Sequence, residues 1–160
     1  MILIDTDFLS SVLKIGHSDL IRSFYATANI RIPIAVYREL ARTNLLPDLL
    51  AIKWIEVDPF EVLPNEPLLG NPTFRDLGTG EQACIVLARA TADSVVLMSD
   101  NKARAFAQSL GVTVVNLPAF LLACKLAKLL DRAEMAQVIQ DLKDKDYYEF
   151  KADIRAVLLS

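Results

Sequence analysis

Cysteine, histidine and glycine are scarce in this chain, and each shortage narrows the chemistry open to it. The two cysteines, Cys84 and Cys124, lie far apart in apolar segments, so neither a disulfide framework nor a zinc site is indicated. We expect both to be small core residues of a cytoplasmic protein. The single histidine, His17, falls in a predicted turn. The glycines, including Gly78 and Gly80, lack the spacing and the lysine of a phosphate-binding loop.

Long hydrophobic runs and an excess of basic residues are also missing. The longest apolar stretch, residues 117–130, is interrupted by Lys125 and Lys128 and is too short to span a bilayer. The short apolar opening before Asp5 carries no basic leader, so we expect no signal peptide and no membrane association. The net charge is −3, which argues against a broad basic surface for nucleic acid. Any contact with nucleic acid must therefore be local.

Apolar residues make up 53% of the 160 positions, enough to bury the core of one globular domain over residues 1–160. Short segments rich in isoleucine and valine predict five strands, at 2–4, 30–32, 54–57, 95–98 and 112–115. Helical periodicity predicts helices at 8–13, 19–28, 33–41, 45–52, 81–92, 102–110, 117–130 and 132–142. Pro33 suits the first turn of its helix. This alternation predicts an α/β fold with a parallel sheet covered by helices on both faces.

Two segments fall outside that alternation. Four of the seven prolines lie within residues 57–78, which predicts an ordered surface loop rather than a helix or strand. Near the end of the chain, Tyr147, Phe150, Ile154 and Val157 recur at helical spacing. We expect this apolar stripe to cover part of the core.

Two acidic residues follow predicted strands, Asp5 after the first and Asp100 after the fourth. In an open parallel sheet, ligands bind beyond the carboxyl ends of the strands, where the strand order reverses. If the first and fourth strands are neighbours, these carboxylates face each other and repel unless a proton or a divalent cation lies between them. A lone aspartate at such a place is more often a helix cap. We expect that role for Asp7, and Asp100 or Asn101 could likewise cap the helix from Lys102.

Two glutamates are further candidates. In LGTGEQACIVLARA, Thr79 and Gln82 predict a capping box, so Glu81 is not needed for capping. Glu81 is then either a surface acid favoured by the helix dipole or a carboxylate aimed into a site. In PIAVYRELAR, Glu39 borders the apolar face of its helix, although a solvated charge beside Arg38 is the simpler interpretation.

Taken together, these segments resemble the PIN domain, a family of metal-dependent ribonucleases that includes the toxins of many bacterial and archaeal toxin–antitoxin pairs. The resemblance is carried by ILIDTDFL, IPIAVYRELA, LGTGEQACIVLA and VVLMSDNKARAFAQSLGVTVV, in that order. The continuation LPAFLLACKLAKLLDRAEMAQVIQDLKDKDYYEF resembles the C-terminal extension of one PIN branch, described mostly as predicted nucleic-acid-binding proteins. The resemblance implies a three-layer α/β/α core with a five-stranded parallel sheet over residues 1–116, followed by a helical extension over 117–160.

The resemblance also implies a site. Its catalytic residues would be Asp5, Glu39, Glu81 and Asp100, with Asp5, Glu81 and Asp100 as ligands of Mg²⁺ or Mn²⁺. Such hard cations prefer carboxylate oxygens, and they supply both a nucleophilic water and stabilisation of charge on a phosphate. The chemistry of phosphodiester hydrolysis therefore suits these residue types.

Other residues have supporting roles in this interpretation. Asn101 stands where the branch usually has a second aspartate, and Asp7 where many relatives have serine or asparagine, so both are accessory candidates. Arg38, Lys102 and Arg104 are candidates for contacts with the RNA backbone. The resemblance further implies an RNA substrate, an antitoxin that covers the acidic cleft, and a homodimer.

Three alternatives remain open on the sequence alone. The D-x-D of Asp5 and Asp7 also opens haloacid-dehalogenase-type phosphatases, but that similarity covers only this short stretch. Asp5, Asp7 and Asp58 mimic the acidic pocket of a response-regulator receiver, although the lysine expected after the fifth strand is missing. The third alternative is a PIN-like module that has lost catalysis and binds nucleic acid or protein. Asn101 and the acidic net charge favour it, and the intact set of four acids argues against it.

Overall fold

A five-stranded parallel sheet forms the centre of the computed structural model, which describes residues 1–26 and 28–160. Its strands are β1 (Ile2–Ile4), β2 (Ile30–Pro33), β3 (Glu56–Asp58), β4 (Val95–Leu97) and β5 (Thr113–Val115). The order across the sheet is β3-β2-β1-β4-β5, and every pairing is parallel. The chain order therefore reverses between β1 and β4, which are paired neighbours in the sheet. The expected neighbourhood of the first and fourth strands is confirmed.

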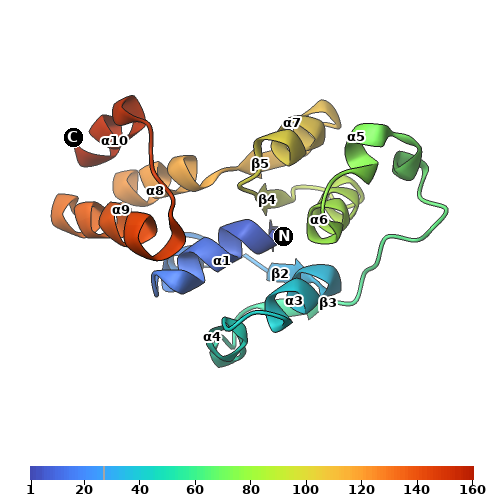
Figure 1. The fold of residues 1–160 in the computed structure, drawn as a ribbon, viewed down its shortest axis with the longest axis horizontal. Helices are drawn as coiled ribbons and strands as arrows, with labels where there is room; N and C mark the ends of the chain where they lie inside the picture. Colours follow the sequence, from blue (N-terminus) through green and yellow to red (C-terminus); the bar gives the residue numbers. More distant parts are fainter. Residues whose placement is uncertain (27) are drawn as a thin grey trace.

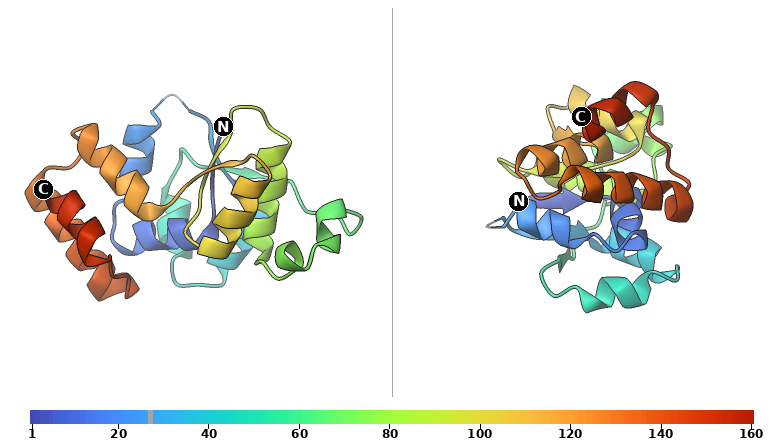
Figure 2. Two further views of the ribbon diagram at one scale, coloured as in Figure 1. Left: turned by 90° about the horizontal axis from the view of Figure 1, so that it is seen from above. Right: turned by 90° about the vertical axis from the view of Figure 1, so that its left-hand side faces the viewer.

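Helices occupy the connections and flank the sheet (Figures 1 and 2). They are α1 (Thr6–Lys14), α2 (Asp19–Phe24), α3 (Ile34–Ala41), α4 (Leu46–Ala51), the 3₁₀ helix η1 (Pro67–Gly70), α5 (Pro72–Arg75), α6 (Thr79–Arg89), α7 (Asn101–Ser109), α8 (Leu117–Leu126), α9 (Arg132–Asp146) and α10 (Ala152–Leu159). Parallel strands need such crossovers, and the helices bury the apolar faces of the sheet. The predicted three-layer α/β/α arrangement is confirmed.

The central strand β1 is buried along its whole length, because helices cover both faces of the sheet. Leu3 and Ile4 are completely inaccessible, and Ile2 is 5% exposed. Its register pairs Ile4 with Leu97 of β4. The two strands thus end at the same level, and whatever follows each of them is brought to one edge of the sheet.

Some of the predicted boundaries were wrong. The helix expected over 19–28 ends at Phe24, and position 27 lies outside the described residues. Pro33 ends β2 and directly precedes α3, rather than standing in its first turn. Residues 57–78 were expected to lack helices, but they contain η1 and α5, both of which begin with a proline. A proline fits a first helical turn because its missing N–H would have no partner there.

The C-terminal extension packs against the sheet domain through α1. Helix α9 contacts α1, and α10 packs on α8 and α9. The expected apolar stripe is only partly correct, because Tyr147 is 91% exposed and Val157 is 51% exposed. Phe150 and Ile154 do pack on the core, and Leu158, 1% exposed, completes that face. Tyr147 breaks the periodicity because its backbone is left-handed, with a φ of 52°.

In the part of the chain that the structure describes, no helix combines the length and the apolar character needed to cross a bilayer.

Candidate active site

Asp5 and Asp100 lie beyond the carboxyl ends of neighbouring strands. Asp5 follows β1 directly, and its main-chain N–H donates to the Leu97 carbonyl of β4 over 2.9 Å. Asp100 follows β4 after Met98 and Ser99. The Ser99 N–H donates to Asp5 Oδ2 over 3.4 Å, which ties the two strand ends together. This is the edge at which an open parallel sheet binds its ligands.

The helix cap in D-x-D is Asp5 and not Asp7. Asp5 is the N-cap of α1, because its Oδ1 accepts a hydrogen bond from the Phe8 N–H over 2.8 Å. Asp7, which was expected to cap this helix, lies inside its first turn. The prediction was wrong because α1 already begins at Thr6, so that Asp5, the one residue between the strand and the helix, takes the N-cap position.

Asp7 instead turns towards the other acids. Burial raises its pKa, and the negative charges of Glu39, Asp100 and Asp146 raise it further. Charges act strongly on a pKa only at short range, so these carboxylates are near neighbours of Asp7, and Asp7, Asp100 and Asp146 line one pocket. Asp7 therefore belongs to the acidic cluster, which we define as Asp5, Asp7, Glu39, Glu81 and Asp100.

Burial makes ionisation costly for two members of the cluster. Asp5 is 0% exposed, and burial is the main cause that raises its pKa to about 8, with further contributions from Asp7 and Glu81. Hydrogen bonds from Phe8 and Ser99 act in the opposite direction. Burial also raises the pKa of Glu81 to about 7, and Asp100, Asp7 and Glu39 raise it further. A bound cation would remove this penalty.

Glu39 reaches the cluster from α3 by capping a neighbouring helix. Its Oε1 accepts hydrogen bonds from the Gly80 N–H over 2.8 Å and from the Thr79 hydroxyl over 2.9 Å. Helix α6 has no capping side chain of its own, since its N-cap is Gly78. The predicted capping box was therefore wrong: Gln82 donates to the carbonyls of Phe74 and Arg75 instead. The carboxylate of Glu39 supplies the missing acceptor.

Gly80 allows this close approach. A β-carbon at that position would stand 2.9 Å from Glu39 Oε1 and 2.9 Å from Thr6 Oγ1. Contacts this short do not occur for real β-carbons, so any side chain would push Glu39 or Thr6 aside. A glycine at this position keeps α3, α6 and the start of α1 together around the acids.

Asp100 combines a structural contact with its place in the cluster. Its Oδ2 accepts the Ala103 N–H over 2.9 Å and so caps α7. Asn101 is exposed, and its side-chain oxygen accepts a hydrogen bond from Arg104. Lys102 is exposed as well. Among the RNA-contact candidates, Arg38 forms an ion pair with Glu61 on the surface.

The receiver-like arrangement of three aspartates is not formed. Asp58 ends β3, which β2 separates from β1. Its carboxylate pairs with Arg31 at 3.2 Å and accepts the Phe60 N–H at 2.9 Å. Asp58 therefore serves the edge of the sheet rather than the acidic cluster.

The donors at the cluster fit a hard divalent cation. They are carboxylate and hydroxyl oxygens, the ligand type that Mg²⁺ and Mn²⁺ prefer. Three buried oxygens there, Thr6 Oγ1, Glu81 Oε2 and Ser99 Oγ, have no hydrogen-bond partner among the described residues. Within residues 1–26 and 28–160, however, no group of three or more Asp, Glu, His or Cys side chains is already arranged to hold an ion. Closing such a site would require the carboxylates to draw together around the cation.

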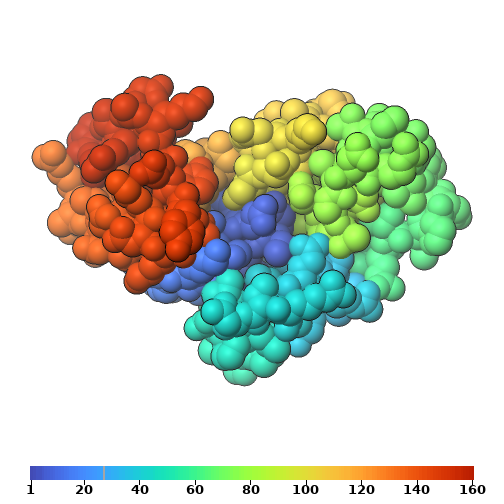
Figure 3. Space-filling view, in the orientation of Figure 1, coloured from blue at the N-terminus to red at the C-terminus, as the bar shows by residue number. Residues whose placement is uncertain are grey.

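The start of α1 lies at the bottom of a hollow in the surface (Figure 3). Figure 3 shows the start of α1, in dark blue, bordered by α3 in cyan, α6 in green, α7 in yellow and the C-terminal helices in orange and red. A pocket on the side of the extension is lined by Asp7, Ser99, Asp100, Asp146 and Tyr148. Asp146 and Tyr148 were not predicted as site residues, because nothing in their local sequence indicates that α9 packs on α1.

Comparison with known protein families places this region of the chain. A sequence model described as a PIN domain matches residues 1–159. Searches of curated proteins and of solved structures find no match. The matched region includes the acidic cluster as well as the C-terminal extension.

Proposed function

This chain belongs to the PIN-domain family, and from that membership and the acidic cluster we propose that it is a metal-dependent endoribonuclease. PIN domains are generally nucleases, and they typically use divalent metals. The observation that carries the finer proposal is that Asp5, Glu39, Glu81 and Asp100, far apart in the sequence, are linked at one end of the sheet: Glu39 binds the Gly80 N–H beside Glu81, Asp5 accepts the Ser99 N–H beside Asp100, and Glu81 lies within range of the charges of the other three. Asp5 and Glu81 also have raised pKa values that a cation would lower.

Each acid has a role in this proposal. Asp5, Glu81 and Asp100 hold Mg²⁺ or Mn²⁺, which when bound supplies an activated water and stabilises charge on the phosphate. The capping bonds that Glu39 accepts through Oε1 leave its other oxygen to orient the attacking water. Asp7 adds negative charge beside these groups. The helix caps at Asp5 and Asp100 fix both carboxylates relative to the strand ends.

Cleavage of RNA tests the proposal. We expect wild-type protein with Mn²⁺ to cleave single-stranded or structured RNA, and a chelator to abolish cleavage. Asp5→Asn together with Asp100→Asn should lower the rate by more than about 100-fold, because even residues behind the ligands of a metal site contribute about 10–100-fold. Asp144→Asn, an exposed aspartate of α9, is the matched control and should cleave normally. The proposal fails if no cleavage occurs, or if cleavage survives the double substitution.

One observation favours a second candidate, a PIN-like module that binds nucleic acid or protein without cleaving it. Asn101 removes a negative charge at the edge of the site, and its side chain is bound to Arg104. RNA binding without cleavage by wild-type protein would favour this module. Restored cleavage in Asn101→Asp would identify the missing charge as the cause.

The proposal extends to partners and setting. We propose that RNA is the substrate, that an antitoxin protein would inhibit by covering the acidic cluster, and that the protein acts in the cytoplasm as a homodimer and as the toxin of a toxin–antitoxin pair. The family resemblance supports these assignments. Light scattering on the purified protein measures the oligomeric state directly.

A further inference from the structure

The C-terminal extension is anchored directly beside the acidic cluster. Asp146, the last residue of α9, accepts the Ser11 hydroxyl over 2.6 Å and pairs with Lys14 Nζ at 2.8 Å. Both partners lie on α1, on whose first turn Asp7 stands. Asp146 is also close enough to raise the pKa of Asp7. The chain that follows α9 is therefore held next to the site by two bonds from one carboxylate.

The backbone then turns so that Tyr148 faces the site. Tyr147 takes up a left-handed conformation with a φ of 52° and is 91% exposed. The next residue, Tyr148, donates its main-chain N–H to the Leu142 carbonyl over 3.0 Å. Its ring packs edge to face on Phe150, with 5.0 Å between the ring centroids. Tyr148 is thus a half-buried aromatic side chain in a fixed position.

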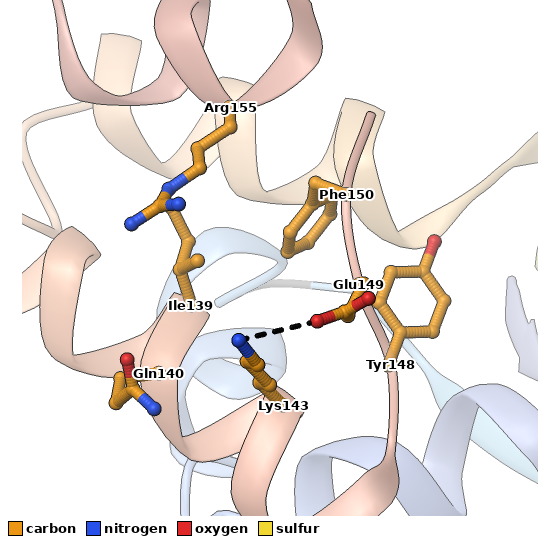
Figure 4. A pocket seen from close by; sticks show the side chains of 7 residues that line it. All are labelled: Ile139, Gln140, Lys143, Tyr148, Glu149, Phe150 and Arg155. Atoms are coloured by element: carbon orange, nitrogen blue, oxygen red, sulfur yellow. Dashed lines mark ion pairs between the residues drawn. The ribbon is translucent and has the colours of Figure 1, made fainter. Parts of the chain in front are cut away.

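Tyr148 lines pockets on both of its sides. The first pocket has a volume of about 290 Å³ and is also lined by Asp7, Ser10, Ser99 and Asp100 of the core. The other lies between α9 and α10 and includes Lys143, Glu149 and Arg155. Figure 4 shows Tyr148 at the edge of this second pocket, with its hydroxyl pointing away from the Lys143–Glu149 ion pair. Tyr148 is thus shared by a pocket that includes Asp7 and Asp100 and a pocket in which Lys143 is paired with Glu149 and Arg155 is a second cation.

The chemistry of the first pocket suits a base and a ribose better than a phosphate. Its walls carry two acids of the cluster and Asp146, and its one cation, Lys14, is already paired with Asp146. Ser10 and Ser99 provide hydroxyl groups that can donate or accept hydrogen bonds. The Tyr148 ring provides an apolar face, and single-stranded nucleic acids bind proteins by stacking bases on such rings.

We propose that Tyr148 is the stacking platform for the RNA base next to the cleaved phosphate, and that the strand continues past it towards Lys143 and Arg155. This inference rests on the proposed ribonuclease function. It makes the extension part of the substrate-binding surface and favours single-stranded RNA, since a paired base is not free to stack on a side chain. Tyr148 is then a residue that positions substrate by direct contact.

Binding of a short, labelled single-stranded RNA tests this inference. Affinity is measured by fluorescence polarisation with Mn²⁺ in an Asp5→Asn background, which keeps the RNA intact. We expect Tyr148→Ala to weaken binding about 5- to 150-fold, the range that loss of one stacked base produces. Tyr148→Phe keeps the ring and should bind within about 3-fold of the parent. Tyr147→Ala removes the exposed neighbouring tyrosine and is the matched control.

A further variant separates stacking from simple loss of packing. Tyr148→Leu fills the space without an aromatic ring, and we expect it to bind as weakly as Tyr148→Ala while melting close to the parent. The inference is overturned if Tyr148→Ala or Tyr148→Leu binds RNA as tightly as the parent. It is also overturned if Tyr148→Phe binds RNA as weakly as Tyr148→Ala. Cleavage by the single variants is measured in parallel. If the wild-type protein cleaves RNA and the Tyr148 variants cleave equally well, the inference about Tyr148 fails and the nuclease function stands. If RNA binding depends on Tyr148 but the wild-type protein does not cleave, the nuclease function fails and the binding role of Tyr148 stands.

Discussion

Three carboxylates of the proposed site also make structural hydrogen bonds. Asp5 and Asp100 cap the helices that follow their strands, and Glu39 caps α6 from a neighbouring helix. From sequence, a cap and a ligand look like competing explanations. Here they reinforce each other, because a capping bond fixes one carboxylate oxygen and thereby directs the other.

Gly80 offers a test of this double role. Alanine in place of a helical glycine ordinarily stabilises a protein by up to about 1 kcal/mol. At Gly80, however, the new β-carbon would collide with Glu39 and Thr6. We therefore expect Gly80→Ala to give no gain in urea-unfolding free energy and to lower RNA cleavage by about 10–100-fold. Gly70→Ala, whose β-carbon would meet nothing within 4 Å, is the control. Full activity in Gly80→Ala would contradict the expectation.

The position of the acids along the chain was predictable, but their contacts were not. Asp5 and Asp100 follow short runs of isoleucine, valine and leucine, and a parallel sheet brings such positions to one edge. The contact of Glu39 with Gly80 depends on how α3 packs on α6, which no local pattern encodes. The same holds for Asp7, whose place inside the first turn follows from the helix starting two residues earlier than expected, at Thr6 rather than at Phe8.

Among the elements, α9 and the segment after it differ most from what the sequence predicted. Helical spacing located α9, although its end was placed four residues too early, at 142 rather than at Asp146. Those extra residues carry Asp146 to α1. The backbone after α9 turns at Tyr147, which is left-handed, and in α10 Leu158 rather than Val157 is buried.

Asp146→Ala should loosen the extension from the core. The substitution removes the bonds to Ser11 and Lys14, so we expect a loss of about 1–3 kcal/mol in the free energy of unfolding. Asp141 lies on the same helix, and its ion pair with Lys145, at 3.9 Å, stays within α9. Asp141→Ala should therefore lower the free energy of unfolding by less than about 0.5 kcal/mol. Urea unfolding measures both values. Equal stability of the two variants would show that Asp146 does not anchor the extension.

For the whole molecule, the acidic cluster links stability to pH. The pKa values of Asp5 and Glu81 rise to about 8 and about 7 on folding, above the ordinary 3.8 and 4.5. Between about pH 4 and pH 8 the folded state therefore binds more protons than the unfolded state, and stability falls as the pH rises. We expect the free energy of unfolding to fall by about 2–5 kcal/mol over that range because of buried Asp5. Glu81 is more exposed and should lower it by less.

Thermal melting at about pH 5 and about pH 8 without metal measures this loss. Asp5→Asn cannot ionise, so its melting temperature should change much less between the two conditions. Mn²⁺ favours the ionised carboxylates and should raise the melting temperature of the wild-type protein most at the higher pH. A wild-type protein that becomes more stable as the pH rises would contradict the raised pKa values.

The hydrogen bond from the Asp5 amide to the Leu97 carbonyl places the candidate catalytic aspartate on the most protected part of the backbone. Amides between central strands exchange with solvent only when the whole protein unfolds, whereas those of surface connections exchange through local openings. The main chain at Asp5 is thus positioned when the sheet folds. If the carboxylates draw together around a cation, we expect the movement to come from side chains and from the helices that carry them, while the strand ends stay in place.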